Sequence, residues 1–483
     1  MLLATSSTLA DNNSITLESQ LVSTTPLTLE DAVAFAVRNN LEIQSAYLQR
    51  IAQKLDLYVA EGKFFPNFTL TSGITNNRIN GSKVSNKDLQ TNVALNLPTG
   101  TKLQVTTSNG LSTGSANSSS KSITITQPLL KNAGLDVNLS SVRVARLDEK
   151  INRQNLKSSL EQTIYQVVLA YRELLRAQDQ KKVAEDSLTR SKEIYSVNKA
   201  LISAGRMAAV DLLQTEADVT NREVALQETE NQVEAARLAL LSLLSLESKV
   251  QILAAQSREI KLKSIDLAYA LNTALSFQSD YKIALLQIEK SKINLEYAKN
   301  QKLWDLSLVA GRSESRINFG SAIDGSLAYG NQDSNQKNIS SYAGLQLTIQ
   351  FGDRTIEQSV VHASVDLKEN NLRLLAIRQL LEQQIRDAVR NAQIRWRQLE
   401  LSRKACQLSS LKLTAEREKL QVGRSSNFQV LSFESDLRNA ESMRVNSEIA
   451  YLNAQTNLEL KTGLLLESMS IPLADREYAE NEF

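Results

Sequence analysis

The chain carries very few of the side chains on which catalytic and metal sites are usually built. It has one histidine, His362, and one cysteine, Cys406. A zinc site draws on several Cys, His or carboxylate ligands, a Cys–His dyad needs both residue types side by side, and a disulfide needs two cysteines. Both residues lie in helical segments, VVHASVD and SRKACQLSS, where packed or idle side chains are the simplest interpretation. We therefore predict no catalytic residue, no bound metal and no cofactor.

Charged residues are numerous but balanced. There are 55 basic and 53 acidic side chains, which give a net charge of +2. The polybasic face of a nucleic-acid-binding protein is not present. The chain also has no run of 18 apolar residues, the length that a membrane-spanning helix requires. We expect no nucleic-acid partner and no transmembrane helix.

Proline and glycine, the residues that most often interrupt helices, are confined to a few places. The prolines lie at positions 26, 66, 98, 128 and 472, so the segment 129–471 contains none. Glycine is absent between Gly134 and Gly205 and again between Gly352 and Gly423. Since proline breaks helix interiors and glycine weakens them, these blocks predict very long helices. One helix across the 70 residues between Gly134 and Gly205 would be roughly 105 Å long.

An internal repeat organises the chain. The segment LTLEDAVAFAVRNN matches IDLAYALNTALSFQ when residues 238 positions apart are aligned. Further along, AGRMAAVDLLQTEADVTN matches VGRSSNFQVLSFESDLRN at an offset of 218. The pairs at this offset include Gly205 with Gly423, Arg206 with Arg424, Leu213 with Leu431, and Glu216 with Glu434. The first copy therefore contains about 20 additional residues between Gly73 and Gly134.

Each copy begins with a helix and continues into strands. Thr28 is a suitable cap for a helix that we expect to run to about Phe64, before Pro66 ends it. Apolar and small polar residues then alternate in FTLTSGI, VALNL, KLQVT and SITIT, and in LSLVA and GLQLTIQF of the second copy. This alternation predicts half-buried strands, either of an ordinary surface sheet or of a wall between lipid and water. The additional residues around Pro98-Thr99-Gly100 predict a further hairpin.

The long helices carry an apolar stripe. Spacings of three and four residues connect Leu160, Ile164, Val167, Tyr171 and Leu174. Val210, Leu213 and Ala217 continue the pattern beyond Gly205. Such a stripe must be buried against the partner helix, the second copy or other subunits. Gly205 and Gly423, roughly midway along the helical runs, mark the tips of two helical hairpins.

These patterns divide the chain into four parts. Residues 1–26 are an N-terminal lead, either the remnant of a secretory signal or a disordered segment. Residues 27–264 are the first repeat, with strands at about 67–127 and long helices at about 135–250. Residues 265–463 are the second repeat, with strands at about 305–351 and long helices at about 353–462. Residues 464–483 are expected to be a flexible tail.

The order of strands, long helix, glycine tip and returning helix, present twice, resembles the TolC-type outer-membrane efflux family. The resemblance covers about residues 27–463 and includes the segments QPLLKNAG and IQFGDR. It implies an α+β membrane protein in which long antiparallel helical hairpins form a periplasmic α-barrel and a few β-strands contribute to a trimeric transmembrane β-barrel. The implied partners are two further copies, outer-membrane lipid, a periplasmic adaptor (membrane fusion) protein and an inner-membrane pump of the RND or ABC type.

In this family the hairpin tips dock the adaptor and narrow the pore. The resemblance assigns these roles to Gly205, Arg206, Asp211, Gly423, Arg424 and Gln429. Asp211 matches an acidic residue that helps to hold the pore shut. The second tip departs from the family pattern, because Ser425, Gln429 and Ser432 stand where an arginine and two acidic residues are expected. Closure by charged pairs is therefore in doubt, and a solvated hairpin end is the alternative for Asp211 and Arg424.

The resemblance implies a passive outer-membrane channel subunit of a tripartite efflux or type I secretion system, located in the outer membrane with its helices in the periplasm. A soluble coiled-coil scaffold is the alternative. It explains the helices but assigns no purpose to the alternating strands and their Ser/Asn/Gly-rich loops. An enzyme would need clustered His, Cys or carboxylate residues in a pocket, which the sequence does not indicate.

Overall fold

The computed structural model describes residues 26–79, 82–112, 117–206, 208–255, 260–262, 266–318 and 335–471. The chain forms two compact units. The first comprises Met1–Arg50, Arg153–Lys282 and Ala376–Phe483, and the second comprises Ile51–Asn152 and Ile283–Leu375. Residues 1–25 of the predicted lead and residues 472–483 of the predicted tail lie outside the described residues.

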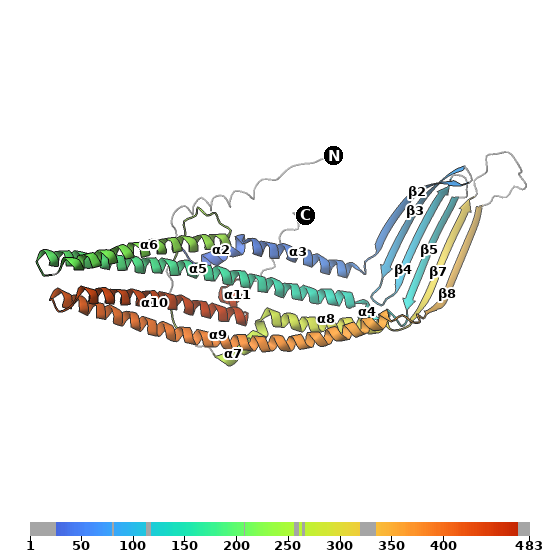
Figure 1. The fold of residues 1–483 in the computed structure, drawn as a ribbon. Coiled ribbons are helices and arrows are strands. Elements are labelled where there is room, and N and C mark those ends of the chain that lie inside the picture. Colours follow the sequence, from blue (N-terminus) through green and yellow to red (C-terminus); the bar gives the residue numbers. More distant parts are fainter. Residues whose placement is uncertain are drawn as a thin grey trace, which may run out of the picture. The chain divides into compact units, whose positions relative to one another are not determined.

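The second unit contains a six-stranded antiparallel sheet (Figure 1). Its order is β2-β3-β4-β5-β7-β8. The strands are β2 (Asn67–Ile79), β3 (Ser82–Asn96), β4 (Lys102–Ser112), β5 (Asn117–Pro128), β7 (Asp305–Asn318) and β8 (Asn335–Thr348). The first copy supplies four strands and the second copy two, so the additional residues of the first copy form the predicted further hairpin. Its turn includes Gly100, whose φ of +94° suits glycine.

Along the chain, the strand segments are preceded or followed by five helices. These are α3 (Leu41–Gly62), α4 (Leu135–Asn138), α5 (Ser140–Ser203), α8 (Ser279–Gln301) and α9 (Thr355–Gln421). Ion pairs connect them within the second unit. Arg146 on α5 contacts Glu61 on α3 at 2.9 Å, and Lys290 on α8 contacts Asp148 on α5 at 2.7 Å. These pairs are substantially exposed, so packing rather than charge accounts for most of the stability here.

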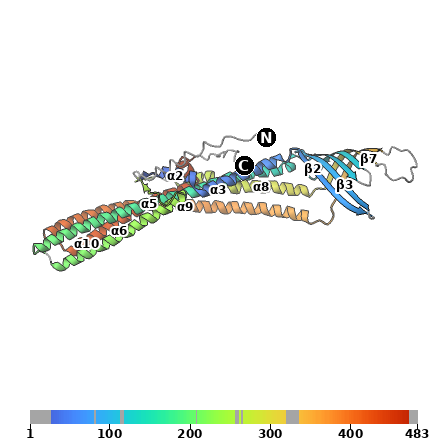
Figure 2. The same ribbon diagram turned by 90° about the horizontal axis from the view of Figure 1, so that it is seen from above.

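The first unit consists mainly of two helical hairpins that run side by side (Figures 1 and 2). Hairpin 1 is α5 with α6 (Ala209–Leu244), and hairpin 2 is α9 with α10 (Asn427–Thr462). The short elements around them are β1 (Pro26–Leu27), α2 (Leu29–Asn39), β6 (Leu253–Ala254), α7 (Leu267–Phe277) and α11 (Leu465–Ser468). Strands β1 and β6 pair in parallel.

The bounds of these elements confirm the internal repeat. Helices α6 and α10 have 36 residues each, and both ends of α10 lie 218 positions after those of α6. The C-terminal ends of α5 and α9 differ by the same 218 positions. Helices α2 and α7 have 11 residues each and lie 238 positions apart. One structural unit therefore occurs twice in the chain.

The apolar stripe of α5 forms the core of the first unit. Leu160, Ile164, Val167, Tyr171 and Leu174 are all buried, as the spacing predicted. Val167, Tyr171 and Leu174 pack with residues of α2 and α6, and Leu160 and Ile164 pack with Val33, Ile43 and α11. The continuation on α6 is different, because Val210 and Leu213 are each 67% exposed in the single chain.

Two expectations about helix ends were wrong. The opening helix does not run unbroken to Phe64, because it ends at Asn39 and a new helix starts at Leu41. Between them, the Asn40 side chain accepts hydrogen bonds from the backbone N–H groups of Glu42 and Ile43, which caps the second helix. The tail is not flexible from residue 464, because Leu465 and Leu466 of α11 are buried in the core.

Candidate functional site

The two hairpin tips have the same backbone geometry. Gly205 has φ +70° and Gly423 has φ +76°, the left-handed conformation that favours glycine. The amides of Arg206 and Arg424 donate to the carbonyls of Leu201 and Lys419, five residues earlier, at 2.9 and 2.8 Å. This is the Schellman arrangement that closes a helix C-terminus. Both predicted glycines therefore end a long helix and let the chain reverse.

A buried polar cluster joins the tips of hairpin 1 and hairpin 2. Asn198 on α5 donates to Thr215 Oγ1 on α6 and to Asn427 Oδ1 on α10, both at 2.8 Å. Asn427 Nδ2 donates to Thr215 Oγ1 at 3.1 Å and to the Asp211 carbonyl at 3.3 Å. Asn198 and Thr215 are fully buried. Three helices are thus fixed in register by amide and hydroxyl groups that water cannot reach.

The predicted tip residues occupy matched positions on the two hairpins. Gly205 and Gly423, Arg206 and Arg424, and Asp211 and Gln429 are each 218 positions apart. A Cβ at Gly423 would lie 3.9 Å from the Arg206 guanidinium, so the two turns are close together. Within the described residues, the Asp211 carboxylate and the Arg424 guanidinium form no ion pair.

Two serines close the second tip, and one of them, Ser425, is a departure from the family pattern. Ser425 donates from Oγ to Glu416 Oε1 at 2.7 Å, and Lys419 Nζ contacts the other oxygen of Glu416 at 2.9 Å. These two hydrogen bonds, the serine's first, lower the pKa of Glu416. Ser426 caps α10 by accepting from the Gln429 backbone amide. The serines thus close hairpin 2 on itself.

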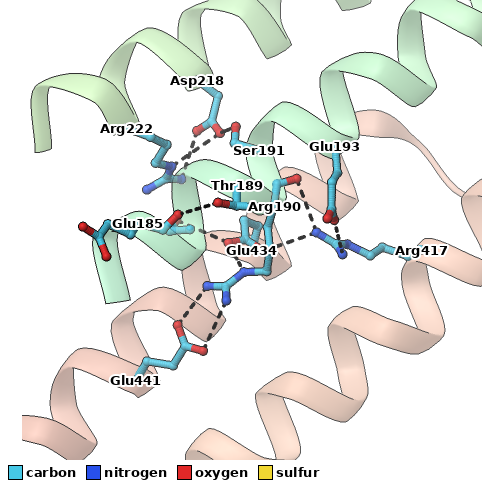
Figure 3. A network of polar contacts seen from close by, with 11 residues as sticks. Glu185, Thr189, Arg190, Ser191, Glu193, Asp218, Arg222, Arg417, Glu434 and Glu441 are labelled. Atoms are coloured by element: carbon cyan, nitrogen blue, oxygen red, sulfur yellow. Dashed lines mark hydrogen bonds and ion pairs between the residues drawn. The ribbon is translucent and has the colours of Figure 1, made fainter. Parts of the chain in front are cut away.

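A network of charged residues lies further along the hairpins (Figure 3). Arg190 on α5 contacts Glu434 and Glu441 on α10, each at 2.8 Å. Glu434 has 0% exposure, accepts from Ser187 Oγ at 3.3 Å and lies 3.8 Å from Arg417 on α9. Burial lowers the pKa of Arg190, but the hydrogen bonds and charges of Glu434 and Glu441 outweigh it, so the pKa is raised. Hairpins 1 and 2 are therefore held together by a desolvated ion cluster.

Comparison with known proteins identifies this arrangement. The family model described as outer membrane efflux protein matches residues 34–245. The first repeat of the chain therefore resembles the outer membrane efflux protein family. The proteases secretion protein PrtF of Dickeya chrysanthemi is 22% identical over 461 residues, which are 92% of this chain and 90% of PrtF.

Solved channels share the fold. The Campylobacter jejuni outer membrane channel CmeC has a TM-score of 0.66 at 15% identity, with 92% of this chain and 90% of CmeC covered. The outer membrane protein VceC of Vibrio cholerae has a TM-score of 0.67 at 14% identity, with 90% and 96% covered. The predicted fold class is confirmed. The chain is an outer-membrane channel protein for efflux or secretion, with its helical part in the periplasm.

The sequence alone predicted the tip glycines but not the buried polar residues of this channel protein. Glu434 was aligned with Glu216, yet only Glu434 is buried, since Arg190 lies opposite it. A difference between the two repeats could have indicated the ion cluster. Arg190 on α5 is matched by Leu408 on α9, so the repeats differ at the position where the ion cluster forms.

A second charged pair is buried where helix ends meet the long helix α5. Lys157 Nζ donates to the carbonyl oxygens of Gly463 at 2.8 Å and Phe277 at 3.1 Å, and it lies 3.6 Å from Glu161 Oε1. A cation at helix C-terminal carbonyls is favourable. Burial raises the pKa of Glu161 to about 7, against the attraction of Lys157.

The lone cysteine and the lone histidine both lie on α9. Cys406 is partly buried and packs against the cluster of Leu413, Leu420 and Val430, and His362 is exposed on α9. Across the described ranges, no group of three or more His, Cys, Asp or Glu side chains is arranged to hold a metal ion. No helix in the described part of the chain is long and apolar enough to cross a membrane.

Proposed function

We propose that this chain is one subunit of a homotrimeric duct that conducts substrates passively from an inner-membrane pump, through a periplasmic adaptor, to the outside of the cell. Its two repeats, residues 27–264 and 265–463, each supply one hairpin. The pump, of the RND or ABC type, supplies the energy, so the channel itself needs no catalytic centre. Likeness to PrtF, which is named for protease secretion, favours protein export over small-molecule efflux.

The observation that carries this proposal is the sheet with two open edges. Within the described residues, β2 pairs only with β3, and β8 pairs only with β7. Phe68, Leu70 and Ile74 on β2 and Leu345 and Leu347 on β8 are exposed. In lipid, unpaired backbone groups cost several kcal/mol each, so such edges must pair with other copies. A soluble scaffold would leave both edges and these apolar side chains in water.

Fractionation of cells that produce the full-length protein tests the proposal. We expect the protein in the outer-membrane fraction, and a detergent-extracted complex whose mass equals three chains. A monomer released without detergent would contradict the proposal and support the coiled-coil scaffold.

We also propose that the tips dock the adaptor and form the aperture. The residues are Gly205, Arg206, Asp211, Gly423, Arg424 and Gln429. Their support is the matched geometry of the two turns, the exposure of Arg206 and Arg424 at the hairpin ends, and the approach of the Arg206 guanidinium to the second turn at Gly423. Exposed arginines on two adjacent tips suit an acidic or carbonyl-rich adaptor surface.

Charge reversal tests the docking role. Arg206→Glu combined with Arg424→Glu should reduce recovery of the adaptor with the channel at least tenfold. The matched control Lys54→Glu combined with Lys299→Glu makes the same charge change on exposed positions of α3 and α8. Equal adaptor recovery from both variants would exclude the tips as the docking site.

A further inference from the structure

The six-stranded sheet has one apolar face and one polar face. Side chains alternate between the faces along each strand, so the register places Ile125, Leu308 and Leu345 on the same face. The other face consists mainly of Thr, Ser, Asn and Gln side chains, among them Ser313 and Ser340, whose hydroxyls are 2.8 Å apart. Under the proposed function, on which this inference rests, the apolar face contacts lipid, because hydrocarbon accepts apolar side chains and excludes polar ones.

The charged residues of the strands are divided unequally between the two faces. Among the strand side chains that the structure describes, the apolar face carries one acidic residue, Glu314, and six basic ones: Arg78, Lys87, Lys121, Arg312, Arg316 and Lys337. The polar face carries Asp88, Lys102 and Asp305. Because basic residues are costly at the centre of a membrane and tolerated at its surface, the six basic residues lie at or beyond the edge of the apolar band.

Four of these basic residues surround Glu314 on three adjacent strands. Lys121 on β5, Arg312 and Arg316 on β7, and Lys337 on β8 are exposed and together form the basic cluster. The register places Lys121 directly opposite Glu314, and Arg316 directly opposite Lys337. The Glu314 carboxylate contacts Arg316 at 2.8 Å and Lys337 at 3.3 Å. Within the described residues, Lys121 and Arg312 form no ion pair.

The height of the basic cluster on the sheet matches the outer surface of a membrane. Trp304 and Phe351, which flank β7 and β8, are exposed aromatic residues of the kind that favours a membrane–water interface. Arg312 and Arg316 lie eight and twelve residues beyond Trp304, which is roughly 26 and 40 Å along a strand. With strands tilted by about 35–45°, these are heights of about 20 and 30 Å, on either side of the upper edge of an apolar band about 25 Å tall. The cluster therefore lies at the level of the lipid headgroups, at the end of the sheet far from the helices (Figure 1).

The charge and size of the basic cluster indicate what kind of headgroup it fits. Four basic residues and one acidic residue leave a charge of +3. A zwitterionic phospholipid headgroup has no net charge and would leave this charge uncompensated. The cluster extends roughly 10 Å across three strands and roughly 13 Å along β7, which is enough for two phosphates separated by a sugar unit. Arginine and lysine both bind phosphate through charge-assisted hydrogen bonds.

We propose that the basic cluster binds the headgroup of a lipid with two phosphates in the outer leaflet of the outer membrane. Lys121 and Arg312 contact one phosphate with their unpaired charges. Arg316 and Lys337 share their N–H donors between Glu314 and the second phosphate. The acyl chains lie along the apolar face below the cluster, beginning at Ile123, which the register places opposite Arg312.

Lipid binding to the detergent-extracted full-length trimer tests this site. The probes are diphosphoryl lipid A and monophosphoryl lipid A with identical acyl chains, and bound lipid is counted by native mass spectrometry. The native channel should bind the diphosphoryl form more tightly. The test variant carries Lys121→Gln, Arg312→Gln and Lys337→Gln and keeps the Arg316–Glu314 pair. Since a basic residue near an anionic lipid surface contributes about fivefold in affinity, this variant should bind diphosphoryl lipid A roughly a hundredfold more weakly.

A matched control separates the site from a general effect of charge. Lys54→Gln, Lys292→Gln and Lys299→Gln remove three positive charges from exposed positions of α3 and α8, and this variant should bind like the native channel. If the test variant does not assemble, the single variants Lys121→Gln and Arg312→Gln take its place, and each should bind about fivefold more weakly. Binding of diphosphoryl lipid A that is as tight in these variants as in the native channel would overturn the proposal.

Failure of this inference and failure of the proposed function give different results. A native trimer that is extracted from the outer membrane but binds the two lipid A probes equally contradicts the two-phosphate site and leaves the duct intact. A native protein that is released as a monomer without detergent contradicts the proposed function, and the lipid site fails with it.

Discussion

Removal of Arg190 should loosen hairpin 1 from hairpin 2 near the tips. Glu434 is fully buried and has Arg190 at 2.8 Å as its main cationic partner, while Arg417 is 3.8 Å away. The variant Arg190→Met keeps the aliphatic part of the side chain and removes only the charge and its hydrogen bonds. Glu434 then keeps its bond to Ser187 and the distant Arg417.

The size of the effect follows from these distances and burial. Breaking a buried ion pair by removing one partner costs about 3–5 kcal/mol, because the other charge stays buried without compensation. Since Arg190 is 18% exposed and Arg417 remains, we expect a cost somewhat below that range, about 2–4 kcal/mol. At about 1.36 kcal/mol per factor of ten, local opening becomes about 30- to 900-fold more frequent.

Hydrogen exchange of backbone amides in residues 427–441 of the full-length channel measures this opening. Lys412→Ala is the control, because the Lys412–Asp436 pair is about half exposed on both sides and such pairs contribute less than about 1 kcal/mol. Arg190→Met combined with Glu434→Leu should restore protection to within about tenfold of the native protein, since apolar replacement of both partners is nearly neutral. Exchange in Arg190→Met no faster than in Lys412→Ala would refute the role assigned to the ion cluster.

Three further predictions concern the remaining buried groups. Because burial raises the folded-state pKa of Glu161 from an ordinary value of 4.5 to about 7, the folded protein binds more protons than the unfolded chain between these values, and stability falls as pH rises from about 4.5 to 7 by up to about 3 kcal/mol. Glu161→Gln should remove that fall in a series of melting temperatures against pH, and an unchanged pH profile would argue against the raised pKa. Gly463→Ala should lower the melting temperature more than Gly205→Ala, because its Cβ would lie 2.7 Å from the Phe277 carbonyl oxygen while that of Gly205 meets nothing; equal losses would show that only the positive φ matters. Asn198→Leu should cost about 1–3 kcal/mol by leaving Thr215 and Asn427 with fewer partners in a buried place, and proteolysis near the tips no faster than in the native channel would contradict this.

Much of the architecture could be predicted because breaker residues and periodicity are local signals. The long helices, the two tips and the strand blocks follow from where proline and glycine are absent and where the spacing changes from helical to alternating. The break at Asn40 was missed because Asn39–Asn40 is a weak interruption inside an apolar helical pattern. The burial of Leu465 and Leu466 depends on a groove formed by distant segments, which no local pattern shows.

The candidate site likewise contains residues that the sequence predicts and residues that it does not. Gly205 and Gly423 could be found because their backbone conformation requires glycine. The cluster of Asn198, Thr215 and Asn427 could not, because each residue alone resembles a solvated polar position on a helix. Burial of these residues is decided by which hairpin face meets the other, and that depends on tertiary packing. Comparison of the two repeats indicates which polar residues are buried only after the contact between hairpins 1 and 2 is known.

Single-channel recording tests the central claim most directly. Purified full-length protein inserted into a planar lipid bilayer should give ohmic conductance steps. Asp211→Lys and Gln429→Lys, at matched positions of the two tips, should shift ion selectivity toward anions while the steps persist. A bilayer that stays electrically silent, although the trimer has been shown to insert, would contradict the account of this chain as a channel.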